Sequence, residues 1–91
     1  MSAVDHPDHY GGKDNPYEAI KVIYAWTAHM DGPAGMNIGN ALKYISRAGK
    51  KDPEKTVEDL EKAIWFLTEQ IKLEEAKQAE IDASFEELES L

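Results

Sequence analysis

The chain of 91 residues is acidic, with ten lysine and arginine residues against eighteen aspartate and glutamate residues and a formal net charge of −8. It has no cysteine, which excludes a disulfide framework and a thiolate metal site. No apolar run reaches membrane-spanning length and no signal-peptide pattern opens the chain, so we expect a cytoplasmic protein with no membrane partner. A domain this small buries only a modest core, which favours self-association.

Residues 5–12 (DHPDHYGG) come first, and their proline and paired glycines predict a turning segment. Its histidines and aspartates make a weak metal motif, because no further histidine or cysteine cluster completes a coordination sphere, and we expect no metal site. The adjacent pair of His9 and Tyr10 is a better candidate, since both rings could stack on a base or hydrogen-bond to it. The alternative is that Tyr10 packs on a helix while His9 is solvated.

The first helix is predicted to begin after Asn15. Asn15 is a preferred N-cap, Pro16 suits the first helical position, and Glu18 stands three residues after the cap to complete a capping box. A broad apolar face follows, made of Ala19, Ile20, Val22, Ile23 and Trp26. Two glycines and a proline in residues 29–35 (HMDGPAG) predict the end of this helix.

Residues 37–51 (NIGNALKYISRAGKK) predict a short central helix that ends at Gly49, a residue suited to the left-handed conformation. Ile38, Leu42 and Ile45 follow the helical period, so we expect them to face the core. A polar set follows the same period on the other face of the helix: Asn40, Lys43, Arg47 and Lys50.

Charge is unevenly distributed along the sequence. Residues 37–55 contain five basic and two acidic residues, whereas residues 72–91 contain two basic and seven acidic residues. A positive island on an acidic protein suits a small anion better than a nucleic acid, because the remaining negative field would repel a long polyanion. The alternative is that Lys43, Arg47 and Lys50 are solvated residues, some of which offset the helix dipole.

A long third helix is predicted next, with two candidate starts. Asp52 is an N-cap candidate with Pro53 in the first turn, and Thr56 with Asp59 offers a later start. Apolar residues then alternate by three and four in a heptad seam formed by Val57, Leu60, Ile64, Leu67 and Ile71, and Trp65 and Phe66 widen it.

At the same spacing, the polar residues Glu74 and Gln78 occupy the next two positions of the seam. Apolar residues then return at Ile81, Phe85 and Leu88. We therefore expect residues 1–71 to form the domain and residues 72–91 to form an acidic helical extension. That extension either pairs with another subunit or frays. No strand is predicted, so the fold class is all-α, a three-helix domain with a long C-terminal helix.

Several kinds of chemistry are excluded or disfavoured. The glycines do not have the spacing of a phosphate loop, and no predicted strand precedes them. A conventional kinase fold is therefore excluded. Ser46 has no histidine at a spacing that favours an activated nucleophile. Glu58, Asp59 and Glu61 could hold Mg²⁺ as in all-α nucleotide pyrophosphohydrolases, but those enzymes need carboxylate pairs on two helices. We expect these carboxylates to complement the helix N-terminus instead.

Four segments, residues 8–10, 18–23, 39–51 and 59–67, resemble in order and spacing a phage-encoded family of small helical proteins. This SaV-like family is a domain of unknown function that is often labelled nucleotide kinase. The label reflects similarity to the C-terminal domain of a podophage deoxynucleoside-monophosphate kinase, which is oligomeric and lacks a phosphate loop. The resemblance covers roughly residues 5–71.

The resemblance implies a nucleotide site built from nine motif residues: His9, Tyr10, Asn40, Lys43, Tyr44, Arg47, Lys50, Asp59 and Lys62. The cations suit phosphates, and Asn40 and Tyr10 suit a base or sugar. Asp59 suits a metal or the orientation of Lys62 or Arg47. The implied partners are a nucleotide and further copies of the chain. If phosphoryl transfer occurs, ATP would bring Mg²⁺ bridging its phosphates.

The leading hypothesis is thus a phage-type nucleotide-binding protein of the host cytoplasm, and a candidate deoxynucleoside-monophosphate kinase without a phosphate loop. One alternative is a non-catalytic sponge that sequesters a nucleotide immune signal. Another is an oligomeric interaction module whose basic face docks an acidic partner. Nucleic-acid binding is disfavoured by the overall charge.

Overall fold

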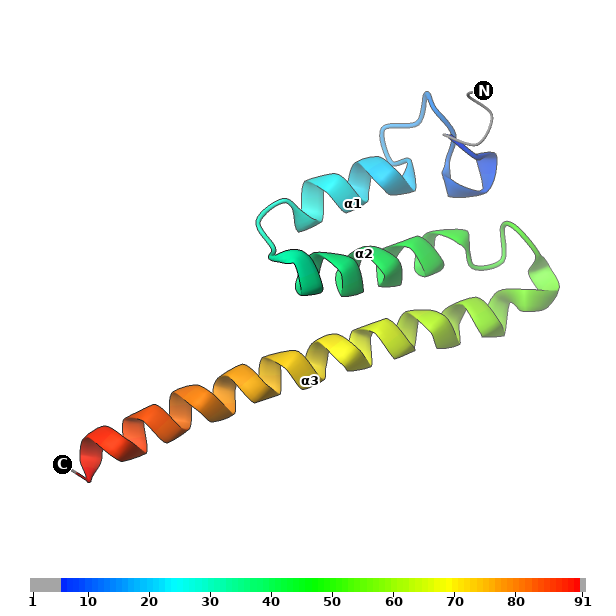
Figure 1. Cartoon of the computed structure of the whole chain (residues 1–91). Coiled ribbons are helices and arrows are strands. Elements are labelled where there is room, and N and C mark those ends of the chain that lie inside the picture. The colour runs from blue at the N-terminus through cyan, green and yellow to red at the C-terminus, as the bar shows by residue number, and fades with distance from the viewer. Residues whose placement is uncertain (1–5, 91) are drawn as a thin grey trace.

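The computed structural model describes residues 6–90, so residues 1–5 and Leu91 of the expected domain and extension lie outside the described part. Helix α2 lies between α1 and α3 and contacts both (Figure 1). The elements in chain order are η1 (Asp8–Tyr10), α1 (Ala19–Thr27), α2 (Gly32–Arg47), η2 (Pro53–Lys55) and α3 (Thr56–Glu89). Residues 6–90 contain no strand, which confirms the all-α prediction.

Helix α1 begins four residues later than its predicted cap. The Asn15 side chain accepts a hydrogen bond from the Tyr17 N–H at 2.8 Å, which closes a local turn instead of capping a helix. Glu18 is the residue before α1, and it makes no side-chain capping bond. The predicted capping box is therefore wrong, because Asn15 bonds the chain two residues on and Glu18 points to other partners.

Helix α2 begins at Gly32, earlier than predicted. The Asp31 carboxylate accepts a hydrogen bond from the Ala34 N–H at 3.0 Å, and Pro33 lies in the first turn, where a helix needs no N–H donor. The segment expected only to end one helix also starts the next. At the other end, Gly49 has a φ of +78°, which confirms the predicted left-handed end of the helix.

The third helix begins at Thr56, the later of its two predicted starts, but Thr56 does not cap it, because its hydroxyl donates to the Pro53 carbonyl at 2.8 Å. The Asp52 carboxylate accepts a hydrogen bond from the Glu54 N–H at 3.1 Å and caps η2, and α3 then runs without a break from Thr56. The C-terminal half of α3 extends past the ends of α1 and α2 (Figure 1). Residues 71–90 are helical almost to the end and are all exposed. None of the helices within residues 6–90 has the length and apolar character needed to cross a bilayer.

The predicted seam of α3 does not pack on α2. Ile64, at its centre, is 61% exposed. Ile45 of α2 is 51% exposed, so the expectation that it faces the core is wrong, whereas Ile38 and Leu42 are half-buried. The side of α3 that meets α2 is made instead by Asp59, Ala63, Phe66 and Gln70. Apart from Phe66, which stacks on Tyr44, the residues of this contact are small or polar, and the apolar seam residues lie outside it.

A buried amide pair joins α2 to α3. Asn37 Nδ2 donates to Gln70 Oε1 at 3.1 Å, and Gln70 Nε2 donates to Glu74 Oε1 at 2.7 Å. Lys77 Nζ lies 3.6 Å from Glu74 and 3.7 Å from the helix-capping Asp31. This chain of polar contacts connects the start of α2 to the middle of α3.

Candidate functional site

Three cations gather around one aromatic ring where α2 meets α3. Lys43 Nζ, Lys62 Nζ and Arg47 Cζ lie 5.2, 5.4 and 5.7 Å from the centroid of the Tyr44 ring. That ring stacks on Phe66 with centroids 6.0 Å apart. Attraction between each cation and the ring face offsets part of the repulsion among the cations. The structure thus brings together four of the nine predicted residues, which we call the Tyr44 cluster.

Arg47 is held by groups of the protein itself. Its Nε lies 3.3 Å from Asp59 Oδ1, and its Nη1 donates to the Tyr10 hydroxyl at 3.2 Å. The Arg47 and Asp59 side chains are only 15% and 2% exposed. Burial disfavours the charged guanidinium, but the Tyr10 hydrogen bond and the Asp59 charge prevail and raise the pKa of Arg47. Arg47 therefore stays cationic and ties η1 to both helices.

His9 sits against Tyr10 with ring centroids 4.2 Å apart. Burial and the positive charges of Lys51 and Arg47 lower the pKa of His9, although the nearby Asp8 carboxylate opposes them. Since an unperturbed histidine has a pKa of about 6.5, His9 is neutral at pH 7. A neutral imidazole at this position can both donate and accept a hydrogen bond.

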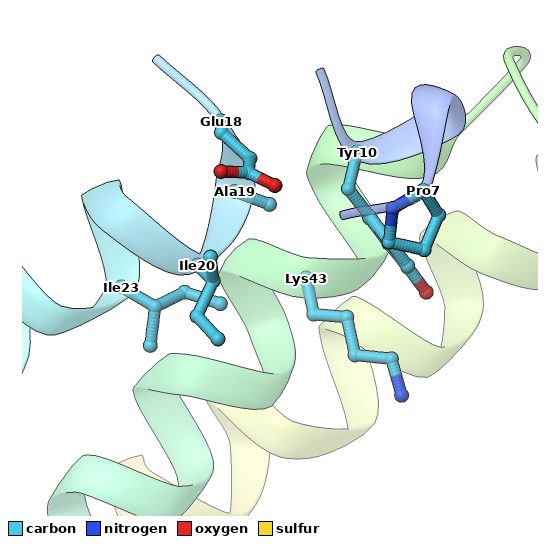
Figure 2. A pocket seen from close by; sticks show the side chains of 7 residues that line it. All are labelled: Pro7, Tyr10, Glu18, Ala19, Ile20, Ile23 and Lys43. Atoms are coloured by element: carbon cyan, nitrogen blue, oxygen red, sulfur yellow. The ribbon is translucent and has the colours of Figure 1, made fainter. Parts of the chain in front are cut away.

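A cavity of about 240 Å³ opens beside the Tyr44 cluster, between the N-terminal segment, α1 and α2. In Figure 2, Ile20 and Ile23 on α1 lie across from Pro7 and Tyr10, with Lys43 of α2 between them. Glu18 and Ala19 complete the lining. Its mainly apolar wall suits a small planar ring, and the Lys43 ammonium at the edge suits an anion.

Glu18 holds the N-terminal segment beside this cavity. Its Oε2 lies 2.7 Å from His6 Nδ1, and its Oε1 lies 3.3 Å from Lys21 Nζ. Burial alone would raise the pKa of the Glu18 carboxyl, but the hydrogen bonds and charges of His6 and Lys21 prevail and lower it. Sequence reasoning assigned Glu18 to a capping box, and no local pattern signals its pairing with a histidine twelve residues earlier.

Gly11 lets the N-terminal segment turn back onto α1. Its φ is +114°, and a Cβ there would lie 3.0 Å from the Glu18 Cα. We therefore expect Gly11→Ala to lower the free energy of unfolding by about 2 kcal/mol through backbone strain and this clash. Chemical denaturation followed by circular dichroism measures the change.

The matched control is Gly35→Ala, because a Cβ at this helical glycine meets nothing within 4 Å. Alanine is favoured over glycine in a helix, so this control should be neutral or stabilising by up to about 1 kcal/mol. Equal destabilisation by the two substitutions would contradict the expected strain at Gly11.

The structure leaves two predicted residues outside the Tyr44 cluster and its neighbours. Asn40 Nδ2 donates to the Met36 carbonyl of its own helix at 2.9 Å, and Lys50 is exposed after the end of α2. Lys62 also pairs with Glu58 at 3.2 Å. Within residues 6–90, no group of three or more histidine, aspartate or glutamate side chains is placed to hold a metal ion.

Comparison with known proteins shows the family to which the chain belongs. The model of DUF3310, described as a protein of unknown function, matches residues 4–68. The chain belongs to the DUF3310 family. The chain is also similar to the Gene 1.7 protein of Enterobacteria phage T3, with 46% identity over 66 residues that cover 71% of this chain and 39% of that protein. No solved structure matches the chain significantly.

The DUF3310 match includes all nine predicted site residues and the residues that line the cavity. The chain spans only about two fifths of the length of the phage T3 relative that it matches. The acidic part of α3 beyond residue 68 lies outside the DUF3310 match.

Proposed function

We propose that this DUF3310 protein binds a nucleotide, with the base in the 240 Å³ cavity and the phosphate at Lys43. One observation carries the proposal: Lys43 both lines the apolar cavity and belongs to the Tyr44 cluster, so a ring site and a cationic site adjoin. Tyr10 connects the two, because it lines the cavity and its hydroxyl accepts a hydrogen bond from Arg47 of the Tyr44 cluster. The resemblance to a phage family labelled nucleotide kinase supports the same ligand class.

The cations have different roles in this proposal. Arg47 is engaged by Asp59 and Tyr10, so it positions the Tyr10 ring. Lys43 forms no ion pair within residues 6–90, and the pair of Lys62 with Glu58 is solvent-exposed and therefore weak. Lys43 and Lys62 are thus the cations that contact phosphate oxygens.

The candidate reaction is phosphoryl transfer from ATP to a deoxynucleoside monophosphate without a phosphate loop. Mg²⁺ would arrive with the phosphates of ATP, because the described residues offer no carboxylate cluster for it. The lysines would stabilise charge on the transferred group.

The second candidate function is nucleotide binding without catalysis, and the ion pairs made by two carboxylates favour it. Asp59 pairs with Arg47, and Glu18 pairs with His6 and Lys21. Both oxygens of Glu18 are therefore engaged, and the unpaired Oδ2 of Asp59 is buried, so neither carboxylate is placed to accept a proton from an attacking oxygen. A sponge for a nucleotide signal needs no such base.

Two measurements on the full chain separate these functions. A thermal-shift screen over deoxynucleoside monophosphates, ATP with Mg²⁺ and cyclic nucleotides identifies a ligand, because a ligand that binds the folded state raises Tm. Incubation with ATP, Mg²⁺ and each monophosphate then tests for diphosphate. Diphosphate formation supports the kinase, stoichiometric binding without product supports the sponge, and no shift with any nucleotide contradicts both.

Replacing Lys43 with alanine should weaken binding of a monophosphate by about 10- to 100-fold, because a charge-assisted hydrogen bond is lost. Isothermal titration calorimetry measures the change in Kd. The control is Lys72→Ala, which removes an exposed lysine from α3 beyond the Tyr44 cluster and should leave Kd unchanged. Equal affinity of the Lys43 variant and the native chain would argue against phosphate contact at this side chain.

A further inference from the structure

Large apolar side chains form a face without a partner on this protein. Within residues 6–90, the buried apolar residues are all alanines, namely Ala19, Ala34, Ala41 and Ala63. The whole seam of α3 is exposed instead, at Val57, Leu60, Ile64, Leu67 and Ile71. A core of buried alanines supplies little hydrophobic stabilisation, so the seam needs a cover.

Helical spacing places the apolar residues of α2 and α3 on one side of the pair of helices. At about 100° per residue, Ile38, Leu42 and Ile45 lie on the side of α2 opposite Lys43. The seam of α3 lies opposite Lys62 by the same count. Because Lys43 and Lys62 both lie over the Tyr44 ring, both apolar sets face away from the Tyr44 cluster.

We propose that this face binds a second copy of the chain, with the two α3 helices antiparallel along their seams. The seam continues along the projecting half of α3 in the same heptad register, at Ile81, Phe85 and Leu88. Full overlap sets Val57 opposite Leu88 of the partner subunit and Ile64 opposite Ile81 of the partner subunit. Each projecting half then covers Val57, Leu60 and Ile64 of the other copy.

The projecting half itself points to a second copy as the occupant. Residues 71–90 are all exposed, and a helix of that length is only marginally stable in water without a neighbour. Its apolar seam residues, Ile81, Phe85 and Leu88, have the same spacing as Val57, Leu60 and Ile64 read in the opposite direction. In the antiparallel pair the apolar residues of each projecting half cover those at the start of the partner's seam, whereas Leu67 and Ile71 at the centre meet Gln78 and Glu74 of the partner subunit.

The charge distribution selects the antiparallel order. Residues 72–91 contain seven acidic and two basic residues, and the basic residues Lys50, Lys51 and Lys55 lie just before or at the start of α3. An antiparallel pair brings each acidic tail to the basic end of the partner and to the positive end of its helix dipole. A parallel pair would set the two acidic tails side by side. The antiparallel order opposes Glu61 to Asp82 of the partner subunit, but at an exposed edge where repulsion costs only about 0.5 kcal/mol.

Size-exclusion chromatography with light scattering tests the pairing. The native chain should have twice the 10.2 kDa chain mass, or an even multiple of it, and Ile64→Asp should shift the pair to single chains. Met36→Asp is the matched control, because Met36 is similarly exposed at 57% but lies on the side of α2 that carries Lys43, away from the seam, and its mass should not change. A native chain at 10.2 kDa, or an Ile64→Asp variant that stays paired, overturns the proposal.

A spin label tests the orientation without disturbing the seam. The chain has no cysteine, so Ser84→Cys provides a single attachment point on the exposed tail. Two labels should lie about 35 Å apart in the antiparallel pair, from a rise of about 1.5 Å per residue. A distance under about 20 Å would show the parallel order and overturn the proposal, as would the absence of dipolar coupling.

Discussion

Replacing Asp59 with alanine is expected to lower the free energy of unfolding by about 3 kcal/mol. The Asp59 carboxylate is almost completely buried against Arg47, whose guanidinium is 15% exposed. Removing the carboxylate leaves a mostly buried cation with no anionic partner among residues 6–90, held only by the Tyr10 hydroxyl and the Tyr44 ring, and breaking one half of such a pair is among the more costly substitutions. Denaturation with urea, followed by circular dichroism, measures the loss.

Two further variants show whether the loss comes from the stranded charge. Glu58→Ala removes the neighbouring carboxylate, which forms a solvent-exposed pair with Lys62, and should change stability by less than about 0.5 kcal/mol. The double variant Asp59→Leu with Arg47→Met should be more stable than Asp59→Ala, because neither charge is then left alone. If the double variant is less stable than the single one, packing rather than charge explains the effect.

Ala63→Leu is expected to cost about 2 kcal/mol or more, because Ala63 lies in the close contact between α3 and α2. The added methyl and methylene groups must push the helices apart or force a strained rotamer. We further expect weaker nucleotide binding, since separating the helices moves Lys62 away from Lys43. Thermal unfolding and titration calorimetry measure the two effects.

The control for this substitution is Ala76→Leu on the exposed projecting half of α3. Leucine is nearly as good a helix former as alanine, and nothing packs against this position on the chain itself, so the change should be within about 0.5 kcal/mol. Similar losses at both positions would mean that the α2–α3 contact is less tight than its burial indicates.

Local signals in the sequence predicted the elements well, because each signal acts within a few residues. Gly49 ends α2 and Asp52 caps the next turn, as their local chemistry indicates. Asn15 misled the prediction because an asparagine can bond its own neighbours as readily as a helix end. Asp31 with Pro33 is the start signal that was missed, since a glycine- and proline-rich segment was taken only as a helix end.

The orientation of the helices could not be predicted from periodicity. The seam through Ile64 has five regularly spaced apolar residues, but the contact with α2 uses the side of α3 that carries Asp59 and Gln70. Periodicity identifies an apolar face, but it does not say whether the same chain or another one covers that face. A second copy, which a sequence does not display, would explain the difference.

Part of the candidate site was accessible from sequence because a motif linked distant residues. The resemblance grouped Tyr10, Arg47 and Asp59, which the structure joins by a hydrogen bond and an ion pair. The cavity was not predicted, because its walls come from three separate segments and include Ile20 and Ile23, which were assigned only to an apolar face. The roles of Asn40 and Lys50 in ligand binding stay predictions.

The buried amide pair between α2 and α3 has a consequence for the spacing of the two lysines. If α3 slid along α2 by one turn, about 5.4 Å, Asn37 and Gln70 would each lose a partner inside a dry contact. Because this hydrogen bond is directional, it favours one position of α3 along the axis of α2. The backbone positions of Lys43 and Lys62 relative to each other are thereby set without a ligand, so the proposed phosphate site needs no sliding of the helices to form.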